Sequence, residues 1–134
     1  MSFLVDTDWV ADYLKGRPGA VQLLNQLAPD GLAISLITLG EIYEGIYYGR
    51  DVKGHQRGFL AFLRLANVIP FNRAIMKRFA LIRGQLRAKG RLIGDPDILI
   101  AATALQDDLT LVTRNLRDFQ RIPNLKLYQP IPQR

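Results

Sequence analysis

The sequence predicts an α/β domain with a largely parallel β-sheet covered by helices on both faces. Short apolar runs alternate along the chain with longer segments of helical periodicity. Acidic or polar residues directly follow several of the short runs. Because α/β proteins place their ligand sites at the carboxyl ends of parallel strands, this pattern also indicates where a functional site lies.

The length of 134 residues fits one domain, and no repeat or long linker divides it, so we predict a single domain over residues 1–134. Strands are predicted at 3–5, 32–35, 67–70, 109–113 and 125–128. Helices are predicted at 8–14, 20–27, 37–48, 54–66, 73–88 and from 96 to about 105. The helix starts follow from capping residues: Thr7 before the first helix and Asn72 before the long fifth one.

Composition excludes several classes of function. The absence of cysteine rules out disulfides, thiolate metal sites and cysteine nucleophiles. The only histidine, His55, stands at a solvated helix start, which leaves Ser/His/Asp hydrolysis and histidine zinc sites without support. No apolar run is long enough for a transmembrane helix, and an acid follows the first residues too soon for a signal peptide, so we expect a cytoplasmic protein. The net charge of +6 is compatible with contacts to phosphate backbones but does not establish them.

Two acids in the first half of the chain are candidates for chemistry. Asp6 directly follows an apolar strand, where it either supports the next helix or serves a site. Glu41 lies four residues into the helix at 37–48. The segment 38–41 also matches a capping box, in which the glutamate accepts a hydrogen bond from a backbone N–H. The two interpretations of Glu41 are equally supported.

Another pair of acids precedes the apolar segment 98–105. Pro96 suits the first position of a helix, which makes Asp95 the expected N-cap and places Asp97 in the first turn. Residues two apart on a helix point in different directions, so we expect only one of these acids, Asp97, to bind a ligand.

Asn115 and Asp118 lie in a polar segment after a later strand, where either is suited to cap a short turn. Thr113 is suited to hydrogen-bond a carboxylate or a water. Carboxylates gathered at one edge of a sheet would select a hard cation, Mg²⁺ or Mn²⁺. Two carboxylates about 5 Å apart repel by roughly 3 kcal/mol at an effective dielectric of about 20, and a divalent cation removes that cost. Arginines are available to hold a phosphate backbone: Arg83, Arg87, Arg91, Arg114 and Arg117. Phosphodiester hydrolysis follows as a hypothesis, with phosphatase chemistry as the open alternative.

The segments 3–7, 35–45, 93–104 and 111–119 together resemble PIN-domain ribonucleases, specifically the VapC toxins of type II toxin–antitoxin pairs. The resemblance covers nearly the whole chain. It implies a three-layer αβα fold with about five strands. It also implies Mg²⁺- or Mn²⁺-dependent hydrolysis of RNA by a metal-activated water, on single-stranded RNA or on structured RNA such as tRNA.

By position, the resemblance assigns the catalytic and metal-binding roles to Asp6, Glu41, Asp97 and Asp118. It gives supporting roles to Thr7, Thr113 and Asn115, and RNA binding to Arg87, Arg91 and Arg114. Some relatives carry an acid at the place of Asn115, and asparagine is common at the place of Asp8. These two differences from the pattern of the family leave the number of metal ions open.

The resemblance also implies a homodimer neutralised by a small VapB-like antitoxin. A candidate antitoxin groove comprises Ile42, Tyr43, Ile46, Tyr47 and Tyr48, with core packing as the alternative role of these residues. Two other functions remain open: a non-toxin PIN nuclease acting in RNA maturation or on DNA, and a catalytically silent regulator that binds nucleic acid.

Overall fold

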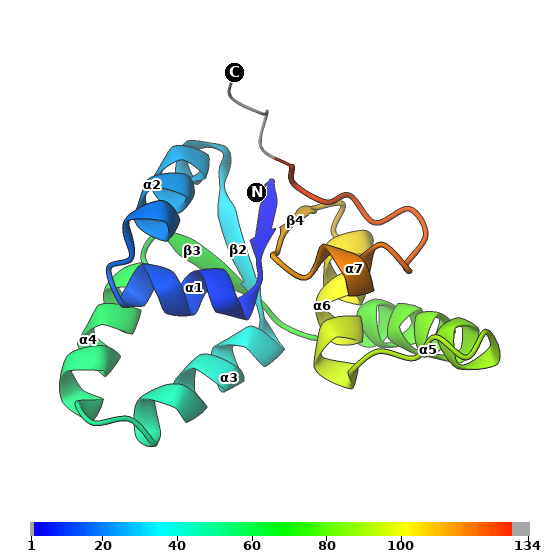
Figure 1. Ribbon diagram of the computed structural model, residues 1–134, viewed down its shortest axis with the longest axis horizontal. Helices are drawn as coiled ribbons and strands as arrows, with labels where there is room; N and C mark the ends of the chain where they lie inside the picture. Colours follow the sequence, from blue (N-terminus) through cyan, green and yellow to red (C-terminus); the bar gives the residue numbers. More distant parts are fainter. Residues whose placement is uncertain (1, 130–134) are drawn as a thin grey trace.

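The central sheet has four parallel strands in the order β3-β2-β1-β4 (Figure 1). The computed structural model describes residues 2–129, so both ends of the predicted domain lie outside the described residues. The strands are β1 (Phe3–Val5), β2 (Leu32–Ser35), β3 (Ala66–Ile69) and β4 (Thr110–Val112). Leu4 of β1 is in register with Ala33 of β2 and with Leu111 of β4.

The fifth strand predicted at 125–128 is only a single parallel bridge between Leu111 and Leu127. The N–H of Leu111 donates to the carbonyl of Lys126, and Leu111 accepts from the N–H of Tyr128 at 2.8 Å. Prolines stand on both sides of this segment in the sequence and have no N–H to extend the ladder. Within residues 2–129 the sheet therefore has four full strands, where about five were expected.

Helices enclose the sheet on both faces, which confirms the three-layer αβα prediction (Figure 1). They are α1 (Thr7–Leu14), α2 (Pro18–Leu27), α3 (Leu36–Tyr47), α4 (Val52–Phe62), α5 (Arg73–Ala88), α6 (Asp95–Gln106) and the short α7 (Leu116–Phe119), with a 3₁₀ turn at η1 (Ala28–Asp30). None of the helices within residues 2–129 is long and apolar enough to cross a membrane.

Alternation along the strands divides the core into two halves. Leu4 and Leu111 point to the side covered by α5 and α6, whereas Val5 and Val112 point to the side covered by α1 to α4. Helix α6 is buried against the sheet and α5 through small residues such as Ala101, which has no exposed surface. Burial on both faces explains why β1 and the first three residues of β2 are apolar without alternation.

The strand order produces a topological switch point between β1 and β4. The chain leaves β1 through α1 and α2 on one face, and it reaches β4 through α5 and α6 on the other. The connections diverge here, and in α/β folds ligands bind at such a point, outside the carboxyl ends of the two strands. The N–H of Asp6 donates to the carbonyl of Val112 at 2.9 Å, and Asp6 therefore stands at the switch point itself.

The predicted N-cap of the first helix, Thr7, is wrong, and of the two interpretations of Glu41 the capping box does not occur. Helix α1 already includes Thr7, and its cap is Asp6, whose carboxylate accepts the N–H of Thr7. Helix α3 is capped by Ser35, whose hydroxyl accepts the N–H of Thr38 at 3.3 Å. The capping box at 38–41 therefore does not form, because the helix begins before it and Glu41 is free to point elsewhere.

The cap of α6 also differs from the prediction. Gly94 is the N-cap, with extended backbone angles, and its carbonyl accepts the first helical hydrogen bond, from the N–H of Ile98 at 3.1 Å. Asp95 is then the first helical residue, and its carboxylate turns outward to Arg83, 2.8 Å from Nε. The placement of Asp97 in the first turn is confirmed, as is the Asn72 cap of α5.

Candidate active site

Asp6 is the most buried acid at the switch point, with 7% of its surface exposed. One carboxylate oxygen accepts the backbone N–H of Thr7 at 2.7 Å. The other accepts the hydroxyl of Thr113, also at 2.7 Å, from the end of β4. The side chain is thereby fixed between two strands, with its orientation set by donors from both.

Thr7 links Asp6 to Glu41. Its hydroxyl donates to Oε1 of Glu41 at 2.7 Å and lies 3.0 Å from the hydroxyl of Thr38. Glu41 is exposed but is held over the start of α1 by this contact. The sequence indicates Thr7 as a supporting residue, whereas it indicates Thr38 only as a helix cap.

Asp97 lies half-buried in the first turn of α6, and its surroundings raise its pKa from 3.8 to about 6. Burial is the largest cause, followed by repulsion from Asp6, then from Asp118, Glu41 and Asp8. Apart from Asp6 and Asp8, which are both at the start of α1, these acids come from different parts of the chain. Asp97 therefore lies near acids from the start of α1, the body of α3 and helix α7.

Asn115 and Asp118 occupy one side of this site together. The amide Nδ2 of Asn115 donates to Oδ2 of Asp118 at 3.1 Å, and the N–H of Asn115 donates to the hydroxyl of Thr113 at 3.0 Å. The charge of Asp118 contributes to the raised pKa of Asp97, and Asn115 orients the carboxylate of Asp118. A continuous chain of hydrogen bonds therefore runs from Asp6 through Thr113 and Asn115 to Asp118.

The pKa of Asp6 is also raised. Burial is the main cause and outweighs the hydrogen bonds from Thr113 and Thr7, which favour the charged form, while Asp8 adds repulsion. Asp8 itself is exposed, so it contributes charge to the site from its rim. The surroundings of Asp6 and Asp97 in the folded chain therefore disfavour the negatively charged form of both carboxylates.

The chemistry of the donors fits a hard divalent cation. Within residues 2–129 no arginine or lysine nitrogen lies within ion-pair distance of Asp6, Glu41 or Asp97, and Asp118 has only a 3.8 Å contact with Arg121. All available ligands are oxygens, the preference of Mg²⁺ and Mn²⁺. No three acidic side chains among the described residues already surround a single point as a finished ligand cage. The site therefore matches Mg²⁺ or Mn²⁺ in its negative charge and in its oxygen ligands.

The arginines expected to bind RNA differ in their surroundings. Arg114 pairs with Asp12 and stacks on Trp9, with its guanidinium carbon 4.0 Å from the ring centroid. Arg87 is exposed in the last turn of α5. Arg91 lines a pocket together with Arg117 and Arg121. Arg121 was not anticipated, although its four-residue spacing from Arg117 is a sequence signal for a shared helical face.

An apolar groove of about 410 Å³ runs beside the acids, between α1, α3 and α4. Thr7 and Glu41 line it along with apolar residues. Two of the residues expected to form an antitoxin groove, Ile42 and Ile46, line this one. The three expected tyrosines do not line it: Tyr43, Tyr47 and Tyr48. Tyr43 instead packs edge-on against Phe59 of the core.

Glycines form much of the groove surface. Gly45 of α3 and Gly58 of α4 both line it, and a Cβ atom added at either would meet nothing within 4 Å. Glycine costs about 1 kcal/mol relative to alanine inside a helix. Its use at these positions leaves the helix backbones accessible from the groove.

Comparison with known proteins identifies the family. The PIN domain model matches residues 3–125. Ribonuclease VapC2 of Rickettsia felis is 33% identical over 129 residues, which cover 95% of this chain and 96% of the relative. The tRNA(fMet)-specific endonuclease VapC of Shigella flexneri is 27% identical, covering 94% of this chain and 96% of that protein.

The fold agrees with the same family. The crystal structure of VapBC2 from Rickettsia felis, bound to a DNA fragment from its promoter, superimposes with a TM-score of 0.88 at 32% identity. That match covers 96% of this chain and 98% of the other. The site acids fall within the region that the family model matches. The chain is therefore a PIN-domain protein and belongs to the VapC ribonuclease group of that family.

Proposed function

We propose that this protein is a metal-dependent endoribonuclease and the toxin of a type II toxin–antitoxin pair. The observation that carries the proposal is that Asp6, Glu41 and Asp118 lie near Asp97 at the switch point, while no lysine or arginine of residues 2–129 pairs with Asp6, Glu41 or Asp97. Similarity to proteins named as VapC ribonucleases over nearly the full chain supports the same reaction.

In this proposal the carboxylates hold Mg²⁺ or Mn²⁺. Such an ion polarises the phosphate and lowers the pKa of water. Asp6 and Asp97, the acids with raised pKa values, are the principal ligands. Glu41 and Asp118 are assigned to the opposite sides of the site.

The threonines and Asn115 keep the acids in place during the reaction. Thr113 and Thr7 hold the Asp6 and Glu41 oxygens through 2.7 Å hydrogen bonds, so the carboxylates need little reorganisation. In-line attack of water on phosphorus, with cleavage of the bond from phosphorus to the 3′ oxygen, leaves a 5′-phosphate and, once the 3′ oxygen takes up a proton, a 3′-hydroxyl. The substrate is single-stranded RNA or a structured RNA such as tRNA, as the name of the Shigella relative suggests.

The proposed partner is a small VapB-like antitoxin that occupies the groove between α1, α3 and α4. The groove is apolar and ends at Thr7 and Glu41, so a segment bound in it would reach the edge of the active site. An apolar helix is the occupant that such a groove accommodates. The match to a VapBC complex structure supports this partner, and we further propose that the toxin forms a homodimer.

Cleavage of RNA in the presence of Mg²⁺ tests the function. We expect the unmodified protein to cleave and Asp97→Asn to lose most activity. Asp95→Asn is the matched control, because Asp95 lies on the same helical turn but pairs with Arg83. Unchanged cleavage by Asp97→Asn would refute the site, and no cleavage by any form would favour a silent nucleic-acid-binding regulator.

The toxin role has a separate test in cells. We expect expression of the protein to arrest growth, and co-expression of the product of a small adjacent gene to relieve the arrest. Normal growth despite RNA cleavage in vitro would instead indicate a PIN nuclease that acts in RNA maturation.

A further inference from the structure

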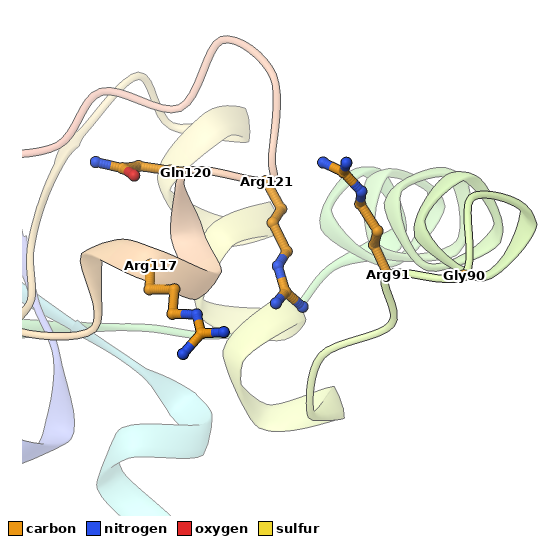
Figure 2. Close-up of a pocket in the computed structure, with 5 residues that line it drawn as sticks. All are labelled: Gly90, Arg91, Arg117, Gln120 and Arg121. Atoms are coloured by element: carbon orange, nitrogen blue, oxygen red, sulfur yellow. The ribbon is translucent and has the colours of Figure 1, made fainter.

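A basic pocket lies between α7 and the connection from α5 to α6 (Figure 2). It has a volume of about 460 Å³ and is lined by Gly90, Arg91, Arg117, Gln120 and Arg121. We call it the arginine pocket. It shares no lining residue with the apolar groove between α1, α3 and α4.

One wall of the arginine pocket is set by the end of α5. Gly90 has a left-handed backbone with φ of 65°, which a residue with a side chain rarely adopts. The N–H of Arg91 donates back to the carbonyl of Leu86 at 2.8 Å, and that of Gly90 donates to the carbonyl of Arg87 at 3.0 Å. This pair of bonds closes the helix in a Schellman motif and fixes the backbone from which Arg91 extends.

The opposite wall comes from α7 and the turn after it. The N–H of Arg121 donates to the carbonyl of Asp118 at 3.1 Å, so the helical path continues past Phe119. Arg117 and Arg121 are four residues apart on this path and share a face. In Figure 2 both side chains extend in the same direction, toward the edge on which α3 and α6 begin, while the amide of Gln120 points away.

The charge of the arginine pocket is largely uncompensated. Within residues 2–129 no carboxylate forms an ion pair with Arg91 or Arg117, and Arg121 has only its 3.8 Å contact with Asp118. Arg114, by contrast, is paired with Asp12. Guanidinium groups without a counter-ion bind phosphate well, because their planar N–H groups match its oxygens. In Figure 2 the groups of Arg117 and Arg121 point the same way, whereas that of Arg91, on the opposite wall, points the other way.

Asp118 connects the arginine pocket to the active site. Its Oδ1 faces Arg121, its Oδ2 accepts from Asn115, and its charge raises the pKa of Asp97. Arg91 lies three positions before Gly94, the cap of the helix that carries Asp97. An RNA strand with one phosphate at the carboxylates would therefore run directly past these arginines.

We propose that the arginine pocket binds a non-scissile phosphate of the RNA backbone and so determines which phosphodiester bond is presented to the carboxylates. The proposal rests on the proposed ribonuclease function. In this proposal the two ligands bind at separate places. The antitoxin binds in the apolar groove beside α3 and α4, and the RNA binds at the arginine pocket beside α7.

Fluorescence anisotropy with a labelled single-stranded RNA, in EDTA so that no cleavage occurs, measures this binding. We expect the double variant Arg117→Gln/Arg121→Gln to bind about tenfold more weakly, the loss typical of a charge-assisted hydrogen bond. The slope of log K against log salt should fall by about 0.7 for each phosphate that the variant no longer neutralises. Arg64→Gln is the matched control, because Arg64 is exposed and precedes β3, at the opposite edge of the sheet.

Unchanged affinity of the double variant, or an equal loss in Arg64→Gln, would overturn the proposal. Unchanged RNA affinity together with weakened antitoxin binding would also overturn it and would place a protein in the pocket. The Arg117→Lys/Arg121→Lys variant retains the charge and should keep the salt slope of the unmodified protein. If the double glutamine variant fails to fold, RNA binding by the double lysine variant is compared with that of the unmodified protein instead.

A series of RNAs, each with one neutral methylphosphonate, locates the phosphate. We expect one position near the cleaved bond to weaken binding of the unmodified protein but not of the double variant, as a double-mutant cycle reports. Coupling at no position would refute the subsite. If one RNA position is coupled to the arginines but the protein does not cleave RNA in Mg²⁺, the phosphate subsite is supported and the nuclease function is refuted. If the protein cleaves RNA but no position is coupled, the nuclease function is supported and the subsite is refuted.

Discussion

The hydroxyl of Thr113 donates a 2.7 Å hydrogen bond to the buried carboxylate of Asp6, across the switch point between β1 and β4. This bond favours the charged form of Asp6 against its burial. Thr113→Val removes the donor at nearly constant volume and leaves a carboxylate oxygen unsatisfied. We expect a loss of about 1–3 kcal/mol in the free energy of unfolding, measured by urea denaturation.

The same variant should raise the pKa of Asp6 further, so the acidic limb of the pH–rate profile should move to higher pH. Thr113→Ser retains the hydroxyl and is the control for both readouts. An unaltered profile in Thr113→Val would show that this hydrogen bond does not set the charge of Asp6.

Asp97 is expected to destabilise the metal-free protein. Its neighbours oppose its charge, so Asp97→Asn should raise the Tm in EDTA at pH 7 by about 3 °C, the effect of roughly 1 kcal/mol in a domain of this size. Asp95→Asn breaks an exposed ion pair with Arg83 and should leave the Tm unchanged or slightly lower. A lower Tm for Asp97→Asn would contradict the repulsion assigned to this site.

The stability of the metal-free protein should depend on pH in a defined direction. The pKa of Asp97 is about 6 when folded against 3.8 as the reference, so between these values the folded state binds more protons than the unfolded one. Asp97 therefore makes the Tm in EDTA fall as the pH rises from about 4 to 6, and the penalty remains at higher pH.

Addition of Mg²⁺ should reverse this loss above pH 6, because the ion binds the deprotonated carboxylates of the folded state. The effect of Mg²⁺ should vanish as the pH falls below 6. A Mg²⁺-induced rise in Tm that is equal at pH 4.5 and pH 7.5 would argue against the carboxylates as its origin.

The glycine surface of the apolar groove provides a test of antitoxin binding. Gly45→Leu and Gly58→Leu place side chains into the open space of the groove, so we expect at least about a 100-fold loss of antitoxin affinity by calorimetry. RNA cleavage without antitoxin should persist. Gly19→Leu, in α2 and also without a neighbour within 4 Å, is the control that should bind normally.

Asp118 and Asn115 are predicted to contribute unequally. Asp118 supplies charge to the site, whereas Asn115 orients it through the 3.1 Å hydrogen bond. We expect Asp118→Asn to lower kcat/KM more than Asn115→Ala, whose loss should be about 10-fold, as for other residues that position a metal ligand. A larger loss in Asn115→Ala would reverse the two assignments.

The sequence predicted the parts of the site that depend on strand and helix ends. Asp6 was identifiable because it follows a buried run, and Asp97 because Pro96 fixes the start of its helix. The caps were harder to predict, since Ser35 and Thr38 both carry hydroxyls suited to an N-cap and only the end of β2 decides between them. Backbone geometry within a residue or two of a helix end is not determined by local sequence alone.

Long-range contacts were beyond what the sequence could predict. Nothing local indicates that Thr7 contacts Glu41 or that Arg114 pairs with Asp12, because both contacts depend on how distant elements pack. The reduced fifth strand has a similar origin. Residues 125–128 have the composition of a strand, but among the residues that the structure describes they exchange backbone hydrogen bonds only with Leu111. The arginine pocket likewise joins two segments far apart in sequence.

The sheet order also governs when the site comes into existence during synthesis. Asp6 and its donor Thr113 are 107 positions apart along the chain, and Asp118 comes later still. The first strands can pair while β4 is still unmade, and contacts this distant are the last to form. The acids of the proposed site therefore cannot come together on a nascent chain until α7 has been made.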